Sequence, residues 1–376
     1  MRAWLLGFVV LVATAAGVAA APGQPAFDES ELVSGAALVL TPSERPIVIP
    51  SSDETFALDA EMESFVAPLK NVREPRQRMQ ALIQALEARG MFSLEYAEVT
   101  RTASDTFHDR QGNCLSFTML FVTLARAVGL QANYQTVVVP PTWSNDGQVV
   151  VASHVNTVVR TGRGEETIVD FNIRPYQSEH RSRRVGDSYA LALFYTNLGA
   201  EAMLRNDDAA ALVYLREAAR VRSDIAGVWV DLGVLYARHG HYEHAEAAYL
   251  RALDVDDDEP SALTNLSLVY DALGERELAA EYRDRVQSYR ERNPYYHFAS
   301  ATQAYEQQQF AEALTSLRKA LRLKSDEEEF YELRGKVQTA LGKSRDATQS
   351  FELARSYAEA EQQRSRSLVE FGLGLR

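Results

Sequence analysis

The sequence predicts an α+β domain followed by an all-α array of helical repeats, and three observations predict this order. From residue 192 onward the sequence repeats itself every 34 residues, a period typical of helical hairpins that stack on their neighbours. The middle of the chain places an apolar helical pattern before three runs rich in β-branched residues. The chain of 376 residues is long enough for two or three folded parts.

Charge and cysteine content exclude several classes of function. The 39 Lys and Arg residues against 52 Asp and Glu residues give a net charge of −13. A negative field repels phosphate groups, so we do not expect nucleic acid or an anionic membrane surface as a partner. The single cysteine, Cys114, excludes an intramolecular disulfide, a CxxC-type zinc site and an iron–sulfur cluster.

Residues 1–20 are predicted to be a signal peptide. Arg2 supplies a positive start, residues 3–21 carry no charge, and Val18-Ala19-Ala20 fits the small-residue pattern of a cleavage site. Since Arg2 is the one charge in this segment, its removal would take the net charge from −13 to −14. We therefore expect an exported, periplasmic protein whose mature chain starts with an extension over residues 21–58. The alternative is an uncleaved segment that tethers the protein to the membrane.

The amphipathic pattern before Cys114 predicts two helices, over residues 61–69 and 75–89. A polar stretch, 100–113, then leads to the cysteine. Residues 115–128 again follow the helical period and end at a glycine. Cys114 thus sits at the N-terminus of a buried helix, where the positive end of the helix dipole stabilises a thiolate, so we expect a lowered thiol pKa.

Three strand-like runs follow this helix, over residues 132–139, 149–160 and 166–171. The second run contains His154 and the third contains Asp170. A cysteine at a helix start, followed by a histidine and an acid on strands, supports nucleophilic catalysis. In such a site the thiolate attacks a carbonyl, the imidazole moves the proton and the carboxylate fixes the imidazole tautomer.

Three short motifs extend this interpretation to a known family. They are Gly112-Asn113-Cys114-Leu115-Ser116-Phe117, Ser153-His154-Val155 and Val169-Asp170-Phe171. In this order they resemble the core of the bacterial transglutaminase-like superfamily, over a domain that we place at residues 59–185. The resemblance implies a papain-like α+β fold, a triad of Cys114, His154 and Asp170, and no cofactor. For the oxyanion hole we expect the backbone N–H of Cys114, with Gln111 as a second candidate donor.

Five copies of the 34-residue repeat occupy residues 192–361. The eighth position of each copy is small, which lets the two helices of a hairpin approach closely; it holds Gly199, Gly233, Ser267, Ala301 and Gly335. The pattern is similar to the tetratricopeptide repeat. Residues 362–376 are then expected to form a capping helix or tail.

Tetratricopeptide repeats stack into a superhelix whose inner surface usually binds a peptide or protein segment. Four candidates for this surface, from the first helices of repeats two and four, are Arg238, Tyr295, Phe298 and Tyr305. The alternative is that the aromatic side chains only pack between repeats. Histidines 239, 241 and 244 cluster in a turn without a carboxylate group to complete a site, so no metal is predicted.

The function that we predict is an exported cysteine acyl-transfer enzyme, which hydrolyses an amide or peptide bond through a thioester while its repeats bind a protein or peptide. One alternative is a transamidase that cross-links proteins, because an amine instead of water can resolve the same thioester. Another is a non-catalytic periplasmic scaffold in which both domains bind partners. The reactivity of Cys114 distinguishes the scaffold from the two enzymes.

Overall fold

The computed structural model describes residues 27–89, 99–138, 142–143, 149–150, 153–162, 165–171, 182–364 and 368–370. The predicted signal peptide lies outside them. The chain divides into two units. We call the first the sheet unit, which comprises Gln24–Val139, Ser153–Val255 and Ser367–Arg376; the second is the helical unit, which comprises Met1–Gly23, Pro140–Ala152 and Asp256–Arg366.

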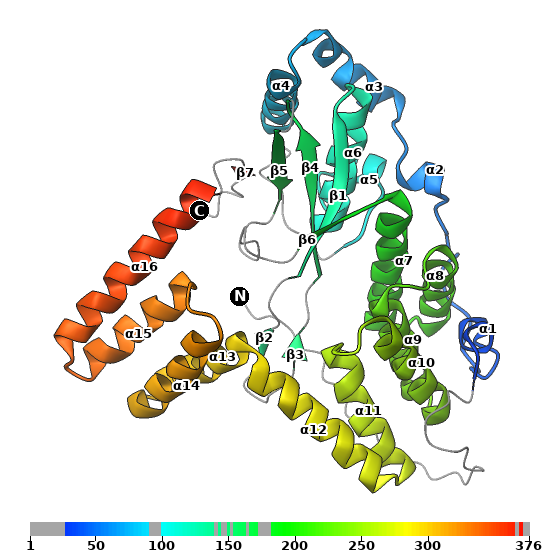
Figure 1. Ribbon diagram of the computed structural model, residues 1–376. Coiled ribbons are helices and arrows are strands. Elements are labelled where there is room, and N and C mark those ends of the chain that lie inside the picture. Colours follow the sequence, from blue (N-terminus) through cyan, green and yellow to red (C-terminus); the bar gives the residue numbers. More distant parts are fainter. Residues whose placement is uncertain are drawn as a thin grey trace. The chain divides into compact units, whose positions relative to one another are not determined.

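The sheet unit is built on a five-stranded sheet with the strand order β6-β1-β4-β5-β7 (Figure 1). Its strands are β1 (Gln131–Val138), β4 (Ser153–Arg160), β5 (Glu166–Asp170), β6 (Ser182–Val185) and β7 (Leu368–Glu370). The pairs are antiparallel except for the parallel pair of β5 with β7. Two of these strands, β6 and β7, come from segments for which the sequence predicted no strand.

The run predicted as one strand over residues 149–160 forms two strands. The short β3 (Val149–Val150) pairs with β2 (Thr142–Trp143) in a separate ladder, and β4 begins at Ser153. The strand that carries His154 therefore starts one residue before the histidine.

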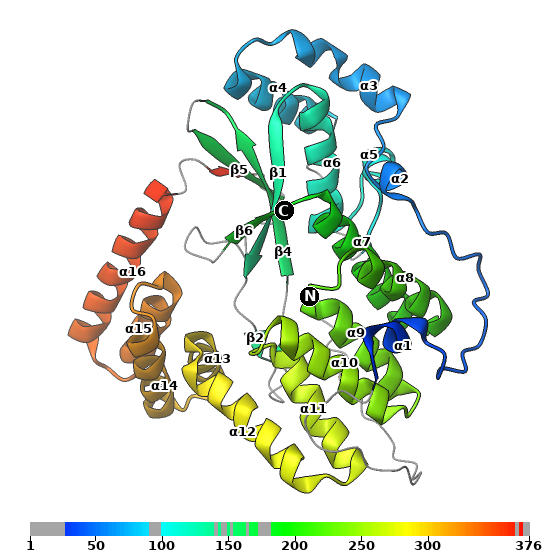
Figure 2. The same cartoon turned by 45° about the vertical axis from the view of Figure 1, so that its right-hand side comes forward.

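Helices pack on the sheet around α6 (Cys114–Ala127), which contacts both β1 and β4 (Figure 2). Against α6 lie α3 (Ala60–Val66), α4 (Pro75–Ala88) and α5 (Ala103–Asp109). A 3₁₀ helix, η1 (Ala67–Asn71), extends α3. The Arg78 side chain of α4 donates to the Val128 carbonyl, 2.8 Å away, and so satisfies an acceptor at the C-terminus of α6. The helix α5 lies in the stretch that the sequence left as a polar connection.

The N-terminal extension is bound through its backbone carbonyls to the first repeats. It carries two short helices, α1 (Glu29–Ser34) and α2 (Ser52–Thr55). The Tyr236 hydroxyl donates to the Leu32 carbonyl at 2.8 Å, and the Tyr195 hydroxyl donates to the Pro50 carbonyl at 2.5 Å. The extension therefore belongs to the fold of the sheet unit.

The repeat region forms ten helices in five antiparallel pairs, of which two belong to the sheet unit and three to the helical unit. The first two pairs are α7 (Asp187–Leu204) with α8 (Asp208–Val221) and α9 (Ala226–Arg238) with α10 (Tyr242–Val255). The other three are α11 (Pro260–Leu273) with α12 (Arg276–Arg292), α13 (Pro294–Glu306) with α14 (Phe310–Leu323), and α15 (Glu328–Ala340) with α16 (Ser344–Arg364).

A glycine at the eighth repeat position allows close contact within a pair. A Cβ atom on Gly233 would lie 2.4 Å from the ring of Tyr249, and one on Gly335 would lie 2.6 Å from the ring of Phe351. Because such distances are far below van der Waals contact, a larger residue would force the two helices apart. The sequence pattern thus has a direct packing cause.

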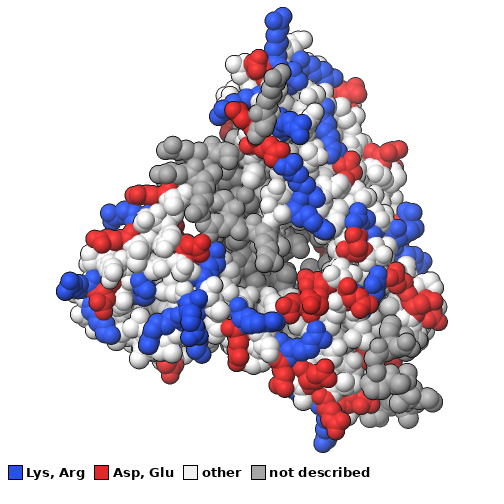
Figure 3. All heavy atoms as spheres, in the orientation of Figure 1, with Lys and Arg blue, Asp and Glu red and all other residues white. Residues whose placement is uncertain are grey.

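Charged side chains of both signs are interspersed over the described part of the face drawn in Figure 3. Among the described residues, no helix is both long enough and apolar enough to cross a membrane.

Candidate active site

Cys114 is the first residue of α6, and the residues before it fix this helix start. The Asn113 side chain accepts a hydrogen bond from the Ser116 N–H at 3.0 Å and donates to the Thr100 hydroxyl at 2.7 Å. Gly112 is required just before this cap, because a Cβ atom there would lie 2.7 Å from Ser116 Cβ. Cys114 itself is partly exposed.

The strand β4 brings His154 to the thiol. The Thr118 hydroxyl lies 2.8 Å from the Cys114 carbonyl and 3.0 Å from the Val155 carbonyl, so it connects the first turn of α6 to the residue after the histidine. The Cys114 side chain lies near enough to the His154 ring to raise the pKa of that imidazole. His154 is 3% exposed, and its position is fixed by surrounding protein.

Asp170, the last residue of β5, holds the other side of the imidazole. Its Oδ2 atom lies 2.7 Å from His154 Nε2, and the carboxylate is fully buried. The next residue, Phe171, packs on Phe117 and Phe121 of α6, with ring centroids 5.8 Å apart in both contacts. The structure thus brings Cys114, His154 and Asp170 together, with both strands anchored to the helix that carries the cysteine.

The surroundings of His154 favour its protonated form. Burial alone would lower the pKa, but hydrogen bonds and charge interactions with Asp170 and Cys114 outweigh it and raise the pKa of His154 to about 9. Because Nε2 contacts Asp170, the Nδ1 atom is the nitrogen that remains for the thiol. A protonated ring between two acceptors is the arrangement of a thiolate–imidazolium pair held by a carboxylate.

The start of α6 also supplies hydrogen-bond donors for an anion. The first N–H groups of a helix lack intrahelical acceptors. The Ser116 N–H is used by the Asn113 side chain and the Phe117 N–H by the Asn113 carbonyl, which leaves those of Cys114 and Leu115. Gln111, the second oxyanion candidate from the sequence, is partly exposed two residues before the cap, and its role stays a prediction.

The site contains one further polar residue that the sequence reasoning missed. Asn156 is fully buried, and its Nδ2 donates to Asp170 Oδ2 at 3.0 Å. Its spacing of two residues from His154 on a strand, which puts both side chains on one face, is the signal that could have found it.

The four candidates for peptide binding are divided between the two units. Arg238 belongs to the sheet unit, whereas the three aromatic candidates belong to the helical unit. The guanidinium of Arg238 donates to the Met203 carbonyl and to Asn206 Oδ1, both at 2.9 Å, and pairs with Asp208. These contacts hold repeat two on the turn of repeat one.

The three aromatic candidates pack on the core between repeats four and five. Phe298 stacks on Phe330 with ring centroids 4.8 Å apart, and the Tyr295 hydroxyl donates to Glu327. Tyr305 lies against the same buried cluster. These contacts are the ones that the packing interpretation predicts, and a role of these residues in peptide binding stays a prediction.

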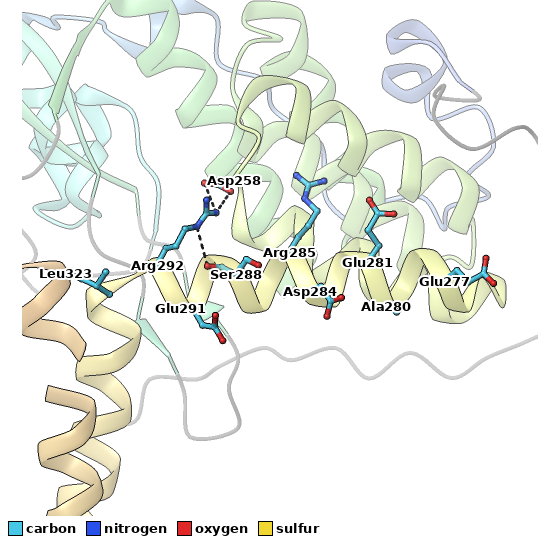
Figure 4. Close-up of a pocket in the computed structure, with 10 residues that line it drawn as sticks. All are labelled: Asp258, Glu277, Ala280, Glu281, Asp284, Arg285, Ser288, Glu291, Arg292 and Leu323. Atoms are coloured by element: carbon cyan, nitrogen blue, oxygen red, sulfur yellow. Dashed lines mark hydrogen bonds and ion pairs between the residues drawn. The ribbon is translucent and has the colours of Figure 1, made fainter. Parts of the chain in front are cut away.

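Two other features offer no comparable chemistry. Among the described residues, no group of three or more His, Cys, Asp or Glu side chains is placed to hold a metal ion. A cavity of about 960 Å³ lies along α12, where Arg292 reaches Asp258 at 3.1 Å (Figure 4). The ten residues that line this cavity include neither cysteine nor histidine, so it holds no thiol–imidazole pair.

Comparisons with known proteins agree with the geometry. The family model of the transglutaminase-like superfamily matches residues 63–166, which include Cys114 and His154 and end before Asp170. A tetratricopeptide-repeat model matches residues 226–259. No curated protein matches the chain in sequence.

Solved structures of repeat proteins resemble part of the chain. MamA from Desulfovibrio magneticus RS-1 is 18% identical, with 47% of this chain and 98% of that chain covered and a TM-score of 0.26. YrrB, described as a TPR protein with an unusual peptide-binding site, is 18% identical, with 46% and 88% covered and a TM-score of 0.26. TM-scores this low carry no argument about function. The chain thus contains a transglutaminase-like core in residues 63–166 and tetratricopeptide repeats C-terminal to it.

Proposed function

We propose that the protein is a cysteine acyl-transfer enzyme that hydrolyses an amide or peptide bond through a thioester on Cys114. One observation carries the proposal: a partly exposed cysteine begins a buried helix and raises the pKa of a buried histidine whose Nε2 lies 2.7 Å from a buried carboxylate. Burying a histidine–aspartate pair costs desolvation free energy. Its position beside the one cysteine of the chain is consistent with a catalytic role that offsets this cost.

The reaction follows from the two faces of the imidazole. The Cys114 thiolate attacks the carbonyl carbon of the amide, and the resulting oxyanion accepts hydrogen bonds from the free N–H groups at the start of α6. His154 gives its Nδ1 proton to the leaving nitrogen as the C–N bond breaks, which leaves an acyl-thioester and a free amine. Water then gives a proton to His154 and attacks the thioester, which releases the acid and restores the thiol.

Asp170 acts through His154. Its carboxylate accepts a hydrogen bond from Nε2–H and so holds Nδ1 towards the thiol, and its charge favours the imidazolium. The same groups serve transamidation, since an amine can replace water in the second step. We propose hydrolysis as the main reaction, export as the route of the protein to its place of action, and a protein or peptide as the partner of the repeats.

The first test uses p-nitrophenyl acetate, an activated ester that acylates reactive thiols. With the full-length protein we expect one acetyl group on Cys114 by intact-mass and peptide mapping, and no acetyl group there in Cys114→Ala. Water should then hydrolyse the acetyl thioester, and the amount of acetate released should equal the amount of thioester lost. A repeat of the experiment with cadaverine added separates the two reactions, because a transamidase converts the amine to its acetyl amide.

The scaffold alternative predicts a different result. If Cys114 is not acetylated faster in the folded protein than in the protein unfolded in urea, the thiol is not activated and the enzymatic proposal fails. An accelerated acetylation that His154→Ala leaves unchanged would contradict the assignment of the base.

A further inference from the structure

Asp170 Oδ2 has two partners from the same strand. It lies 2.7 Å from His154 Nε2 and accepts a hydrogen bond of 3.0 Å from Asn156 Nδ2. The Asn156 side chain is fully buried, with a relative exposure of 0%. The one carboxylate oxygen that holds the imidazole is therefore also held by a buried amide.

The sheet register explains why these three side chains meet. The strand pair β4–β5 is antiparallel and places Thr157 opposite Val169, so one step further along the ladder Asn156 lies opposite Asp170. Directly opposed residues point to the same face of a sheet. His154 lies two residues before Asn156 and shares that face, which puts it diagonal to Asp170.

The amide of Asn156 is only half used. Its Oδ1 atom is buried and has no hydrogen-bond partner in the described part of the chain. Burying an amide oxygen without a partner costs stability, so an apolar residue of similar size would suit a purely structural position better. The donor half, in contrast, is directed at the carboxylate that orients His154.

We propose that Asn156 is a positioning residue of the active site, which holds the Asp170 carboxylate in the orientation that keeps His154 Nδ1 on Cys114. The inference rests on the proposed function of this triad. The Asn156 donor on Oδ2, beside the imidazole, restrains rotation of the carboxylate about the Cβ–Cγ bond. Loss of the donor loosens the imidazole and weakens its ion pair with the thiolate.

The test is the pH profile of Cys114 alkylation by iodoacetamide in the full-length protein. Asn156→Leu removes the donor at similar side-chain volume. The matched control is Thr157→Val, because Thr157 is the next residue, is equally buried and has a hydroxyl without a partner. The wild type should react at pH ~6 in a manner that depends on His154.

For Asn156→Leu we expect the alkylation rate at this pH to fall about ten-fold or more, which corresponds to the loss of one hydrogen bond to a charged group. Thr157→Val should keep the wild-type profile. If Asn156→Leu is not folded by circular dichroism, Asn156→Ala replaces it, since it removes the donor without adding bulk or charge and is expected to show the same loss.

The outcomes separate this inference from the proposed function. A wild-type profile in Asn156→Leu, together with loss of low-pH reactivity in His154→Ala, would overturn the role of Asn156 and leave the triad intact. An equal shift in Thr157→Val would also overturn it, because the effect would then be structural. A wild-type thiol that reacts independently of His154 would overturn both.

Discussion

Two of the histidine–aspartate pairs in the sheet unit have nearly equal length but differ sharply in burial. His154 Nε2 lies 2.7 Å from Asp170, and His108 Nε2 lies 2.8 Å from Asp59. The side chains of the first pair are 3% and 0% exposed, whereas those of the second are 40% and 31% exposed.

The partners of the exposed pair explain what it does. Asp59 Oδ1 caps α3 by accepting from the Glu61 and Met62 N–H groups, and Oδ2 accepts from His108 and from the Ser104 hydroxyl. Since that hydroxyl donates to the carboxylate, the imidazole does not activate it. This pair joins α3 to α5, and water screens its charges.

The distance between imidazole and carboxylate therefore does not by itself identify a catalytic pair. What distinguishes His154 and Asp170 is burial on two strands, together with a thiol at a helix start on the free side of the ring. Water weakens the interaction within the exposed pair, which only connects two helices. The low dielectric around the buried pair strengthens its interactions, so the loss of either partner has a larger effect.

The largest expected difference is in turnover. Asp170→Asn should lower the rate of ester hydrolysis on the order of ten- to a thousand-fold, because the asparagine no longer favours the imidazolium or its tautomer. Asp59→Asn should leave that rate at the wild-type value. The measurement is steady-state p-nitrophenyl acetate hydrolysis by both variants, with circular dichroism as the check on folding. Equal rates in the two variants would mean that the buried pair has no catalytic role.

The two pairs should also lose their stabilising effect at opposite ends of the pH scale. The pKa of His154 in the folded protein, about 9, exceeds the ordinary value of about 6.5, so its contribution is complete below pH ~6.5 and is lost as the pH rises through 9. The difference is on the order of 3 kcal/mol. Urea unfolding of the wild type should show this alkaline decline, and His154→Gln should not.

Asp59 predicts the acid counterpart, which is smaller. Burial would raise its pKa, but hydrogen bonds from Ser104, Met62 and His108 outweigh that effect and lower the pKa of Asp59 to about 2. Its contribution is therefore complete above pH ~4 and lost as the pH falls through about 2. After discounting for solvent screening we expect about 1 kcal/mol. Urea unfolding of Asp59→Ala should lack this acid-side decline, and an unchanged decline would assign it to other carboxyl groups.

Much of the fold could be predicted because the signals are local. Each repeat carries its own helix starts, stops and small residues, so α9 and α11 begin at Ala226 and Pro260, where the 34-residue register puts them. The helix that begins at Cys114 was predicted from its apolar period and its terminal glycine.

Other elements lacked such signals. The strand β6 is short and arginine-rich, at an edge of the sheet without alternating hydrophobicity, and β7 pairs with β5 across about two hundred residues of sequence. The short helix α5 is polar, although Thr102, whose side chain accepts from the Asp105 N–H, marks its start. The N-terminal extension is bound through backbone carbonyl acceptors, which every residue has, so no side-chain pattern in the sequence predicts this contact.

The candidate site divides in the same way. Cys114, His154 and Asp170 were predicted by residue type and order, whereas Asn156 acquires its partner only through the register of β4 with β5.

The central claim is that His154 carries a proton between Asp170 and Cys114 at neutral pH, and NMR titration of its imidazole tests this most directly. With ring nitrogens labelled and the signal assigned through His154→Gln, we predict that the ring stays protonated at pH 7 and titrates near pH 9, the pKa that its surroundings favour. In Cys114→Ala the transition should move to lower pH, because one hydrogen-bond acceptor and its charge are lost. A ring that titrates at its ordinary value of about 6.5 in the wild type, with no change in Cys114→Ala, would contradict the account.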